Sequence, residues 1–225
     1  MHKGTYTDLS GEYYDAKKHP TCANFREASL VLSDHWLAAL ALPSSSVLEV
    51  GAGASIVADW ISGGDRMVAS LVATDISREM LTYSYRSHIA AKYIVCNAEI
   101  LPFAAGSFDI VVSSLGDPYN TPQFWKEAAR ALRSGGYVLF TTPSHEWALK
   151  FRGETETAEF ALSDGRVISV PSYVKASYEQ RQLMEDNALT LIDSRAIEDA
   201  ALRLTPRSPK LRPGPVVSGY LGMKR

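Results

Sequence analysis

The sequence has few cysteines and no excess of charge of either sign. Its two cysteines, Cys22 and Cys96, lie far apart and belong to no Cys-x-x-Cys motif or cysteine–histidine cluster, so no metal site is expected. The 225 residues carry 23 Lys and Arg against 25 Asp and Glu, a formal net charge of -2. This balance does not indicate a nucleic-acid or membrane-surface partner, because such partners attract clustered positive charge.

Long hydrophobic segments are also missing. Residues 1–10 are polar and lack the apolar stretch of a secretory signal peptide. No apolar run elsewhere reaches the length needed to span a bilayer. We therefore expect a cytoplasmic protein with no membrane partner. Hydrophobic residues make up 46% of the chain and charged residues 21%, which is ordinary for a globular protein, and the length fits one domain over residues 1–225.

The spacing of apolar residues indicates an α/β fold. Spacings of three and four predict an amphipathic helix over residues 24–42. After it, short apolar runs alternate with segments that open on a serine or threonine cap. This alternation predicts a doubly wound parallel sheet with right-handed crossovers and helices on both faces. The predicted strands are 47–50, 68–74, 93–96, 108–113 and 137–142, and the predicted helix caps are Ser55, Ser77 and Thr121.

The last third of the chain has a different pattern. Two short apolar runs flank residues 163–166, which contain an Asp-Gly pair, and together they predict a β-hairpin. Residues 173–187 favour a helix. Two further apolar segments, 189–197 and 216–223, predict the last two strands.

A glycine-rich turn joins the first strand of the sheet to the helix after it. Gly51 and Gly53 have no Cβ, so the backbone can turn tightly and approach a ligand closely. Amides at the start of the helix can face polar or anionic ligand groups, and the strand ends of an open α/β sheet form the crevice where ligands bind. Such a turn can also be no more than a tight connection.

Two acidic residues strengthen the ligand-binding interpretation. Glu49 lies on the strand just before the turn, and Asp75 lies at the end of the second strand, where a carboxylate can accept both hydroxyls of a ribose. The alternative role for Asp75 is to cap the next helix. We favour ribose binding, because position and strand order agree. A nicotinamide-type fingerprint is not present, since its third glycine position is occupied by Ile56.

Residues 46–142 resemble the class I S-adenosylmethionine-dependent methyltransferases. The resemblance implies a Rossmann-like, seven-stranded, mostly parallel sheet whose last strand is inserted antiparallel, with S-adenosylmethionine as the cofactor. The motifs that carry it are Glu49-x-Gly51-x-Gly53, Asp75, Asn97–Phe103, Ser107–Ser114 and Arg130–Gly136. The cofactor-binding residues that it implies are Glu49, Gly51, Ala52, Gly53, Asp75, Ile76, Asn97, Ala98, Glu99 and Ser114.

Two positions depart from the pattern of that family. Ser55 stands where the family often has glycine, and a serine can still cap the helix. Asn97 stands where the family often has aspartate, and its amide oxygen can still accept the exocyclic amine of adenine. We therefore expect adenine recognition to survive both departures.

The acceptor is expected beyond the ends of the fourth and fifth strands. There Asp117-Pro118-Tyr119 is similar to the Asp-Pro-Pro-Tyr motif of amine-modifying nucleic-acid methyltransferases, with one proline missing. The alternative, which we favour, is a polar turn that still places Asp117 and Tyr119 at the mouth of the site. His145, after the fifth strand, is either a general base or a solvated loop residue. The candidate catalytic residues are Asp117, Tyr119 and His145.

Two segments lie outside the alternating pattern. Residues 1–45 form an N-terminal arm and helix, in which Tyr13, Tyr14 and His19 either cover the cofactor as a lid or pack as an ordinary arm. Residues 144–172 contain the predicted hairpin as an insertion after the fifth strand. By resemblance, an insertion at this place shapes the acceptor pocket.

Methyl transfer to a small-molecule acceptor is the leading hypothesis. The reaction is an in-line displacement that depends on alignment and exclusion of water, so it does not require a catalytic triad or a metal. The even charge disfavours a nucleic acid, but an RNA or protein acceptor stays an alternative. So do a catalytically inactive cofactor-binding partner subunit, and aminopropyl transfer, which needs more acids than Asp117. We expect a monomer or a homodimer.

Overall fold

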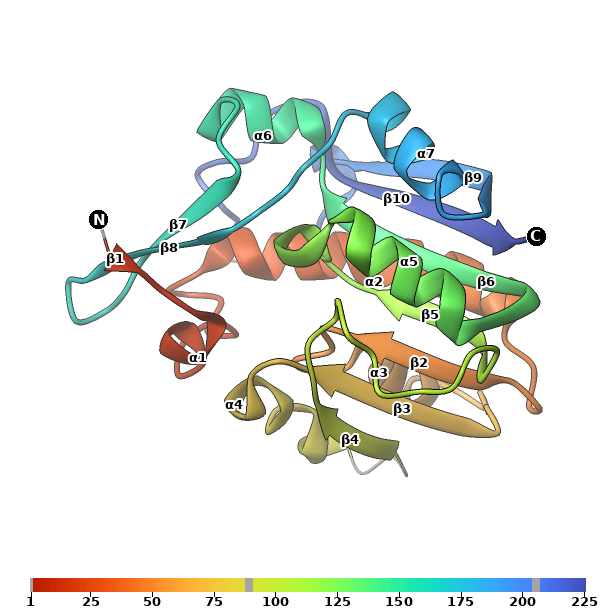
Figure 1. The fold of residues 1–225 in the computed structure, drawn as a ribbon. Helices are drawn as coiled ribbons and strands as arrows, with labels where there is room; N and C mark the ends of the chain where they lie inside the picture. The colour runs from red at the N-terminus through yellow and green to blue at the C-terminus, as the bar shows by residue number, and fades with distance from the viewer. Residues whose placement is uncertain (1, 88–90, 204–206) are drawn as a thin grey trace.

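A computed structural model of the chain describes residues 2–87, 91–203 and 207–225, and a seven-stranded sheet forms its centre (Figure 1). The strands from β4 to β6 pair in parallel, while β10 is antiparallel to both of its neighbours. The predicted doubly wound sheet with an antiparallel last strand is therefore confirmed. In spatial order the strands are β4 (Ala91–Val95), β3 (Ser70–Asp75), β2 (Ser46–Val50), β5 (Phe108–Ser113), β6 (Leu132–Pro143), β10 (Pro215–Lys224) and β9 (Leu189–Glu198).

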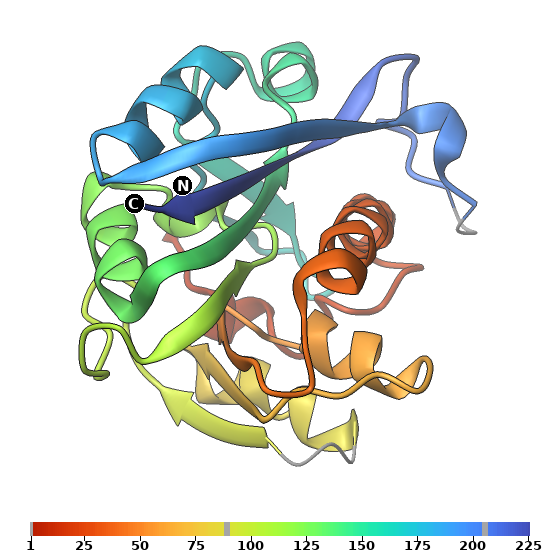
Figure 2. The ribbon, with the colours of Figure 1, turned by 90° about the vertical axis from the view of Figure 1, so that its right-hand side faces the viewer.

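Helices cover both faces of this sheet, as Figure 2 shows. Successive side chains of a strand point to opposite faces, so each buried strand contributes to two hydrophobic clusters. Val47 accordingly packs in the cluster under one pair of helices, and Leu48 packs in the cluster under the other pair. The first pair is α2 (Pro20–Leu40) and α3 (Ile56–Ser62), and the second pair is α5 (Pro122–Ala131) and α7 (Ser177–Glu185).

Hydroxyl caps fix where the helices after the strands begin. The hydroxyl of Ser55 accepts a hydrogen bond from the backbone N of Ala58 at 2.9 Å, which starts α3. Ser77 caps α4 (Arg78–Leu81) and Thr121 caps α5 in the same way. All three predicted caps are confirmed. Because each cap follows the end of a strand, the turns between them gather at the carboxyl edge of the sheet.

A second, three-stranded sheet lies at that same edge. It consists of the predicted hairpin, which is confirmed, and an N-terminal strand that pairs in parallel with it. Figure 1 shows this sheet and α1 beyond the carboxyl ends of β2, β3 and β5. The arm and the hairpin share one hydrophobic cluster, so they pack against each other. The elements are β1 (His2–Lys3), α1 (Tyr6–Leu9), β7 (Thr157–Ala161) and β8 (Val167–Pro171).

The structure differs from the sequence prediction in two places. His145 does not lie in a loop but begins α6 (His145–Arg152). In this helix the ring of Trp147 packs against the ring of Phe25, with the ring centroids 4.7 Å apart. Helix α6 has only eight residues, which is too short to show a repeating pattern of apolar residues in the sequence. Its contact with Phe25 joins residues that are far apart in the sequence. In addition, β6 begins at Leu132 and passes through Gly135, whose positive φ of 74° lets the strand bend without ending.

Short 3₁₀ helices complete the described elements. They are η1 (Ser84–Ser87), η2 (Asp117–Tyr119) and η3 (Asp199–Ala201). Within residues 2–87, 91–203 and 207–225, none of the helices combines the length and apolar character that a membrane span requires.

Candidate active site

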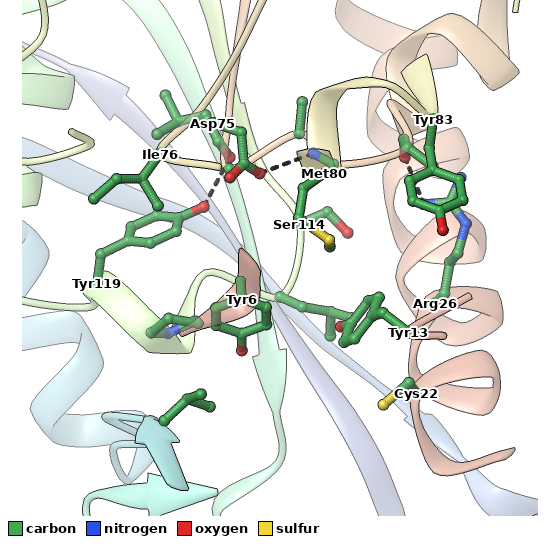
Figure 3. A pocket seen from close by; sticks show the side chains of 18 of the residues that line it. Tyr6, Tyr13, Cys22, Arg26, Asp75, Ile76, Met80, Tyr83, Ser114 and Tyr119 are labelled. Carbon is green, nitrogen blue, oxygen red and sulfur yellow. Dashed lines mark hydrogen bonds between the residues drawn. The ribbon is translucent and has the colours of Figure 1, made fainter. Parts of the chain in front are cut away.

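A cavity of about 850 Å³ lies at the carboxyl ends of β2, β3 and β5. Three parts of the chain line it: the turns that follow these strands, one face of α2, and the arm together with the hairpin. Figure 3 shows side chains from all three parts around the same space. A volume of this size is within the range of about 300–1,000 Å³ that is typical of small-molecule sites.

The glycine turn forms one wall of the cavity. Gly51 and Gly53 have φ angles of 64° and 48°, in the left-handed region that favours glycine. A Cβ on Gly51 would lie 2.1 Å from the hydroxyl oxygen of Tyr119, and one on Gly53 would lie 2.1 Å from the hydroxyl oxygen of Tyr14. Both glycines are therefore required by conformation and by the close approach of a tyrosine. Ala52 lies between them and also lines the cavity.

Glu49 supports this turn from behind. Its buried carboxylate accepts hydrogen bonds from the hydroxyl of Ser55 and from the backbone N of Ile56, the latter at 2.9 Å. Burial raises the pKa of Glu49 to about 7. Glu49 does not line the cavity, so its position fits a residue that holds the start of α3 in place. A direct role in cofactor binding stays a prediction.

Asp75 lies at the end of β3 with its carboxylate at the cavity wall. One oxygen accepts a hydrogen bond from the backbone N of Gly53 at 3.0 Å, and the other accepts one from the backbone N of Ser77 at 2.9 Å. The cap of α4 is Ser77 and not Asp75. Each carboxylate oxygen can accept a second bond, so the group is aimed and still able to accept hydroxyls of a ligand. Burial raises the pKa of Asp75.

An apolar side chain next to Asp75 faces the same space. Ile76 lines the cavity, yet 67% of it is exposed. Asn97, Ala98 and Glu99 line the cavity as well, and the amide oxygen of Asn97 accepts the backbone N of Glu99 at 2.9 Å. An exposed isoleucine in a concave site gains by covering a flat apolar ligand, because the contact removes apolar surface from water.

The end of β5 contributes Tyr119 and Ser114. Tyr119 donates a hydrogen bond to the carbonyl oxygen of Val50 at 2.7 Å and lies 3.0 Å from the hydroxyl of Ser113. It thus bridges the ends of two neighbouring strands and lines the cavity. Leu115, which follows Ser114, has a φ of 52°, an uncommon conformation for a non-glycine residue and one that marks functional sites.

Two of the candidate catalytic residues do not line the cavity. The buried carboxylate of Asp117 accepts a hydrogen bond from Ser172, whose hydroxyl accepts one from Arg152 at 2.6 Å. Burial raises the pKa of Asp117 to about 6. This chain of contacts ties η2 to the end of the hairpin. His145 also lies outside the lining. The catalytic roles of Asp117 and His145 stay predictions that this placement does not support.

The N-terminal arm reaches the glycine turn directly. The backbone N of Ala54 donates a hydrogen bond to the hydroxyl of Tyr14 at 2.7 Å, and Tyr13 and Tyr14 both line the cavity. Arg26 on α2 lies over the ring of Tyr14, with its guanidinium carbon 5.6 Å from the ring centroid. His19, the third predicted lid residue, does not line the cavity. Its Nε2 atom lies 3.1 Å from Oε1 of Glu12.

Sequence reasoning missed part of the lining. Leu115 and Tyr6, and with them Cys22, Arg26 and Val170, belong to no motif of the sequence. On α2 the spacing of four between Cys22 and Arg26 placed both on one helix face, but it gave no sign that this face would meet a ligand. The signal that could have found them is the high tyrosine content of the arm.

Comparison with known proteins agrees with the geometry. Residues 48–140 match a family model described as a methyltransferase domain. The malonyl-[acyl-carrier protein] O-methyltransferase of Buchnera aphidicola is 24% identical over 158 residues, which cover 68% of this chain and 62% of that protein. The mitochondrial arginine-hydroxylase NDUFAF5 of Danio rerio is 28% identical over 128 residues, 56% of this chain and 39% of that protein.

Solved structures show the same fold. An S-adenosylmethionine-dependent methyltransferase from Listeria monocytogenes superposes with a TM-score of 0.69 at 14% identity, over 88% of this chain and 99% of that chain. The aligned part of the chain spans less than two thirds of the curated relatives that it matches first. Residues 48–140 thus match a methyltransferase domain, and the sheet order is that of the methyltransferase fold which the solved structures share.

The residues at the sheet edge fit S-adenosylmethionine. A tight glycine turn with no side chain of its own lies at Gly51 and Gly53, a carboxylate with acceptor capacity lies at Asp75, and an exposed apolar side chain lies at Ile76. These three features match the amino-acid end, the ribose and the adenine of the cofactor in turn.

Proposed function

We propose that the protein transfers a methyl group from S-adenosylmethionine to a small-molecule acceptor. The main support is that one cavity joins the glycine turn and Asp75 to a chamber bounded by Tyr6, Tyr13 and Val170. A donor and an acceptor bound in the two parts of this cavity would be held side by side, and holding reactants in place is the largest contribution that a protein makes to such a reaction.

The cofactor-binding residues are those of the sheet edge. Asp75 would accept the ribose hydroxyls, Ile76 and Ala98 would enclose the adenine, and the turn at residues 51–53 would lie against the amino-acid end. Bound there, S-adenosylmethionine supplies an electrophilic methyl group: a lone pair of the acceptor bonds to the methyl carbon, the carbon–sulfur bond breaks, and an acceptor proton leaves to water.

The remaining side chains would align the acceptor and exclude water. Tyr119 lines the cavity with its hydroxyl already bound to Val50, so its role would be to shape the floor through its ring. Tyr14 covers the glycine turn from the side of the arm. No general base is part of this proposal, because Asp117 and His145 lie outside the lining.

A small molecule fits the cavity better than a macromolecule does. The arm and the hairpin pack on one another through Leu9, Ile168 and Val170 and so form an outer wall. The net charge of -2 also lacks the positive excess that RNA binding requires. A protein-bound acceptor is the second candidate, and it is favoured by the likeness to a malonyl-[acyl-carrier protein] O-methyltransferase.

Calorimetry with S-adenosylhomocysteine tests the cofactor site. Ile76→Asp should weaken binding roughly tenfold or more, because it replaces apolar contact with a charge that adenine would bury. The matched control is Ile100→Asp, since Ile100 is 72% exposed but does not line the cavity. Both variants should unfold at similar temperatures. Equal binding by the two variants would contradict the adenine assignment.

Methyl transfer itself is tested with labelled cofactor. The protein is incubated with S-adenosylmethionine labelled in the methyl group and with separated pools of small molecules, RNA and protein. We expect label in the small-molecule pool. Label in RNA or protein alone would overturn the acceptor proposal, and binding of S-adenosylhomocysteine without labelling of any pool would favour a cofactor-binding subunit without catalysis.

A further inference from the structure

The part of the cavity away from Asp75 has an aromatic and apolar lining. We call it the acceptor half and define it by Tyr6, Tyr13, Cys22, Pro118 and Val170. Figure 3 shows Tyr6, Tyr13 and Cys22 on the opposite side of the pocket from Asp75 and Ile76. The rings of Tyr6 and Tyr13 meet edge to face with centroids 5.9 Å apart, so they form one aromatic surface.

Two hydroxyl groups in this half have no partner. Among the residues that the structure describes, neither the Tyr6 hydroxyl nor the Tyr13 hydroxyl makes a hydrogen bond, although both side chains line the cavity. The other three tyrosines of the lining differ, because Tyr14 is bonded to Ala54, Tyr83 to the carbonyl oxygen of Ser10 and Tyr119 to Val50. Both residues are half-buried and line the cavity, so the two hydroxyls keep their donor and acceptor capacity for a ligand there. Burial raises the pKa of both phenols, which keeps them neutral.

Charged side chains of the lining are already engaged. Arg26 donates to the carbonyl oxygen of Ala54 at 2.7 Å, and Glu99 accepts the hydroxyl of Thr121 at 2.5 Å. Asp75 accepts backbone amides, as described above, and Glu27 accepts the backbone N of Arg203 at 2.8 Å.

Arg152 lies on the other side of the wall and donates to Ser172. The five residues that define the acceptor half carry no charged side chain, and the charged side chains at its border, among them Arg26 and Glu27, already hold partners. Burial of an unpaired charge there would be costly.

The geometry points to an uncharged aromatic small molecule as the methyl acceptor, held by its ring against Tyr6 and Val170 and by a polar atom on the hydroxyls of Tyr6 and Tyr13. This inference rests on the proposed function. It separates the chain from its malonyl-[acyl-carrier protein] relative, whose name describes methylation of an acyl group that carries a carboxylate. A phenol or a nitrogen heterocycle supplies both the ring and a nucleophilic lone pair.

Two probes of the same shape test the class of acceptor. Binding of 1-naphthol, which is neutral at pH 7, is compared with binding of 1-naphthoate, which is an anion, by fluorescence titration of protein saturated with S-adenosylhomocysteine. We expect the naphthoate to bind roughly tenfold more weakly or worse, because its charge has no partner in the acceptor half. Equal affinity for the two probes would overturn the inference.

Three variants localise the binding. Tyr6→Phe combined with Tyr13→Phe keeps both rings and should weaken 1-naphthol by roughly two- to tenfold for each hydroxyl that it uses. Tyr178→Phe is the matched control, since Tyr178 is 75% exposed and outside the lining. Cys22→Phe adds a ring to the acceptor half and should abolish 1-naphthol binding while S-adenosylhomocysteine still binds.

Each outcome has one meaning. Unchanged 1-naphthol binding in the double variant and in Cys22→Phe would place the probe elsewhere and refute the inference. Failure of the wild-type protein to bind S-adenosylhomocysteine would instead refute the proposed function, and the acceptor assignment would fall with it even if 1-naphthol bound. Because the two ligands are titrated separately, the two failures are distinguishable.

Discussion

The cofactor half of the cavity, formed by residues 51–53 with Asp75 and Ile76, differs from the acceptor half in how its polar groups are used. Asp75 is fixed by the backbone amides of Gly53 and Ser77 before any ligand arrives. The hydroxyls of Tyr6 and Tyr13 in the acceptor half have no such partners within the described residues. One half is therefore preorganised, and the other is completed by what it binds.

The origin of the residues explains this difference. The cofactor half comes from turns that directly follow β2 and β3, where parallel pairing of the strands sets the geometry. The acceptor half is assembled from the arm, α2 and the hairpin, which are far apart in sequence and meet through side-chain packing and the short pairing of β1 with β8. A fold of this kind can keep one ligand and change the other, because arm residues such as Tyr6 and Tyr13 do not hydrogen-bond to the strand ends, whereas Tyr14 does contact the glycine turn.

The largest difference between the cofactor half and the acceptor half is expected from a substitution of Asp75. Asp75→Ala removes an acceptor for two ribose hydroxyls, and hydrogen bonds to a charged group contribute about 1.5–3 kcal/mol each, so affinity for S-adenosylhomocysteine should fall on the order of 100-fold or more. Binding of 1-naphthol to the cofactor-free protein should not change. Calorimetry and the fluorescence titration measure the two effects.

Asp65→Ala is the control for this variant, since Asp65 is exposed and does not line the cavity. It should bind both ligands like the wild-type protein. Normal affinity of Asp75→Ala for S-adenosylhomocysteine would show that Asp75 does not hold the cofactor and does not belong to the cofactor half.

The buried acid behind the cofactor half predicts a dependence of stability on pH. Burial raises the pKa of Glu49 from 4.5 to about 7, so the folded protein holds this proton more tightly than the unfolded chain does. The resulting stabilisation is fully present below about pH 4.5 and is lost as the pH rises to 7. It amounts to at most about 3 kcal/mol.

Glu49→Gln should remove that dependence, because the amide keeps the shape and cannot ionise. Urea unfolding at pH 6.0, 6.5, 7.0 and 7.5 measures it. Asp117, whose pKa burial raises to about 6, titrates in the lower part of the same interval, so the difference in slope between the wild-type protein and Glu49→Gln is the quantity that reports Glu49. Equal slopes in the two proteins would contradict the assignment to Glu49.

The fold and the cofactor half were largely predictable from the sequence. Strands buried on both faces give short apolar runs, and caps such as Ser55 mark helix starts, so the strands and helix starts followed from local signals, while the antiparallel last strand was implied by the family resemblance. Gly51 and Asp75 are local too, because a turn and a strand end carry their own chemistry. Glu49 shows the limit: the motif named the residue, but only the structure shows that its carboxylate turns away from the cavity.

The acceptor half was not predictable in the same way. Tyr6 and Val170 lie far apart in the sequence and meet because the arm pairs with the hairpin and packs on it. A helix as short as α6 carries no periodic signal of its own, so His145 was placed in a loop. Asp117 was expected at the mouth of the site, yet its carboxylate is buried and accepts a hydrogen bond from the hydroxyl of Ser172. Long-range packing decided all three, and sequence spacing does not record it.

The smallest effects should come from the two candidate catalytic residues outside the lining. Asp117→Asn keeps an oxygen for the hydroxyl of Ser172, and His145→Ala removes a side chain that does not reach the cavity. Both variants should transfer labelled methyl groups to the acceptor pool within roughly threefold of the wild-type rate, since neither loses a group that touches a ligand. A large loss of rate in Asp117→Asn, with 1-naphthol and S-adenosylhomocysteine still bound, would show that Asp117 takes part in the reaction. The acceptor half would then be as preorganised as the cofactor half, because an acid fixed by Ser172 and Arg152 would already be aimed at the acceptor before it binds.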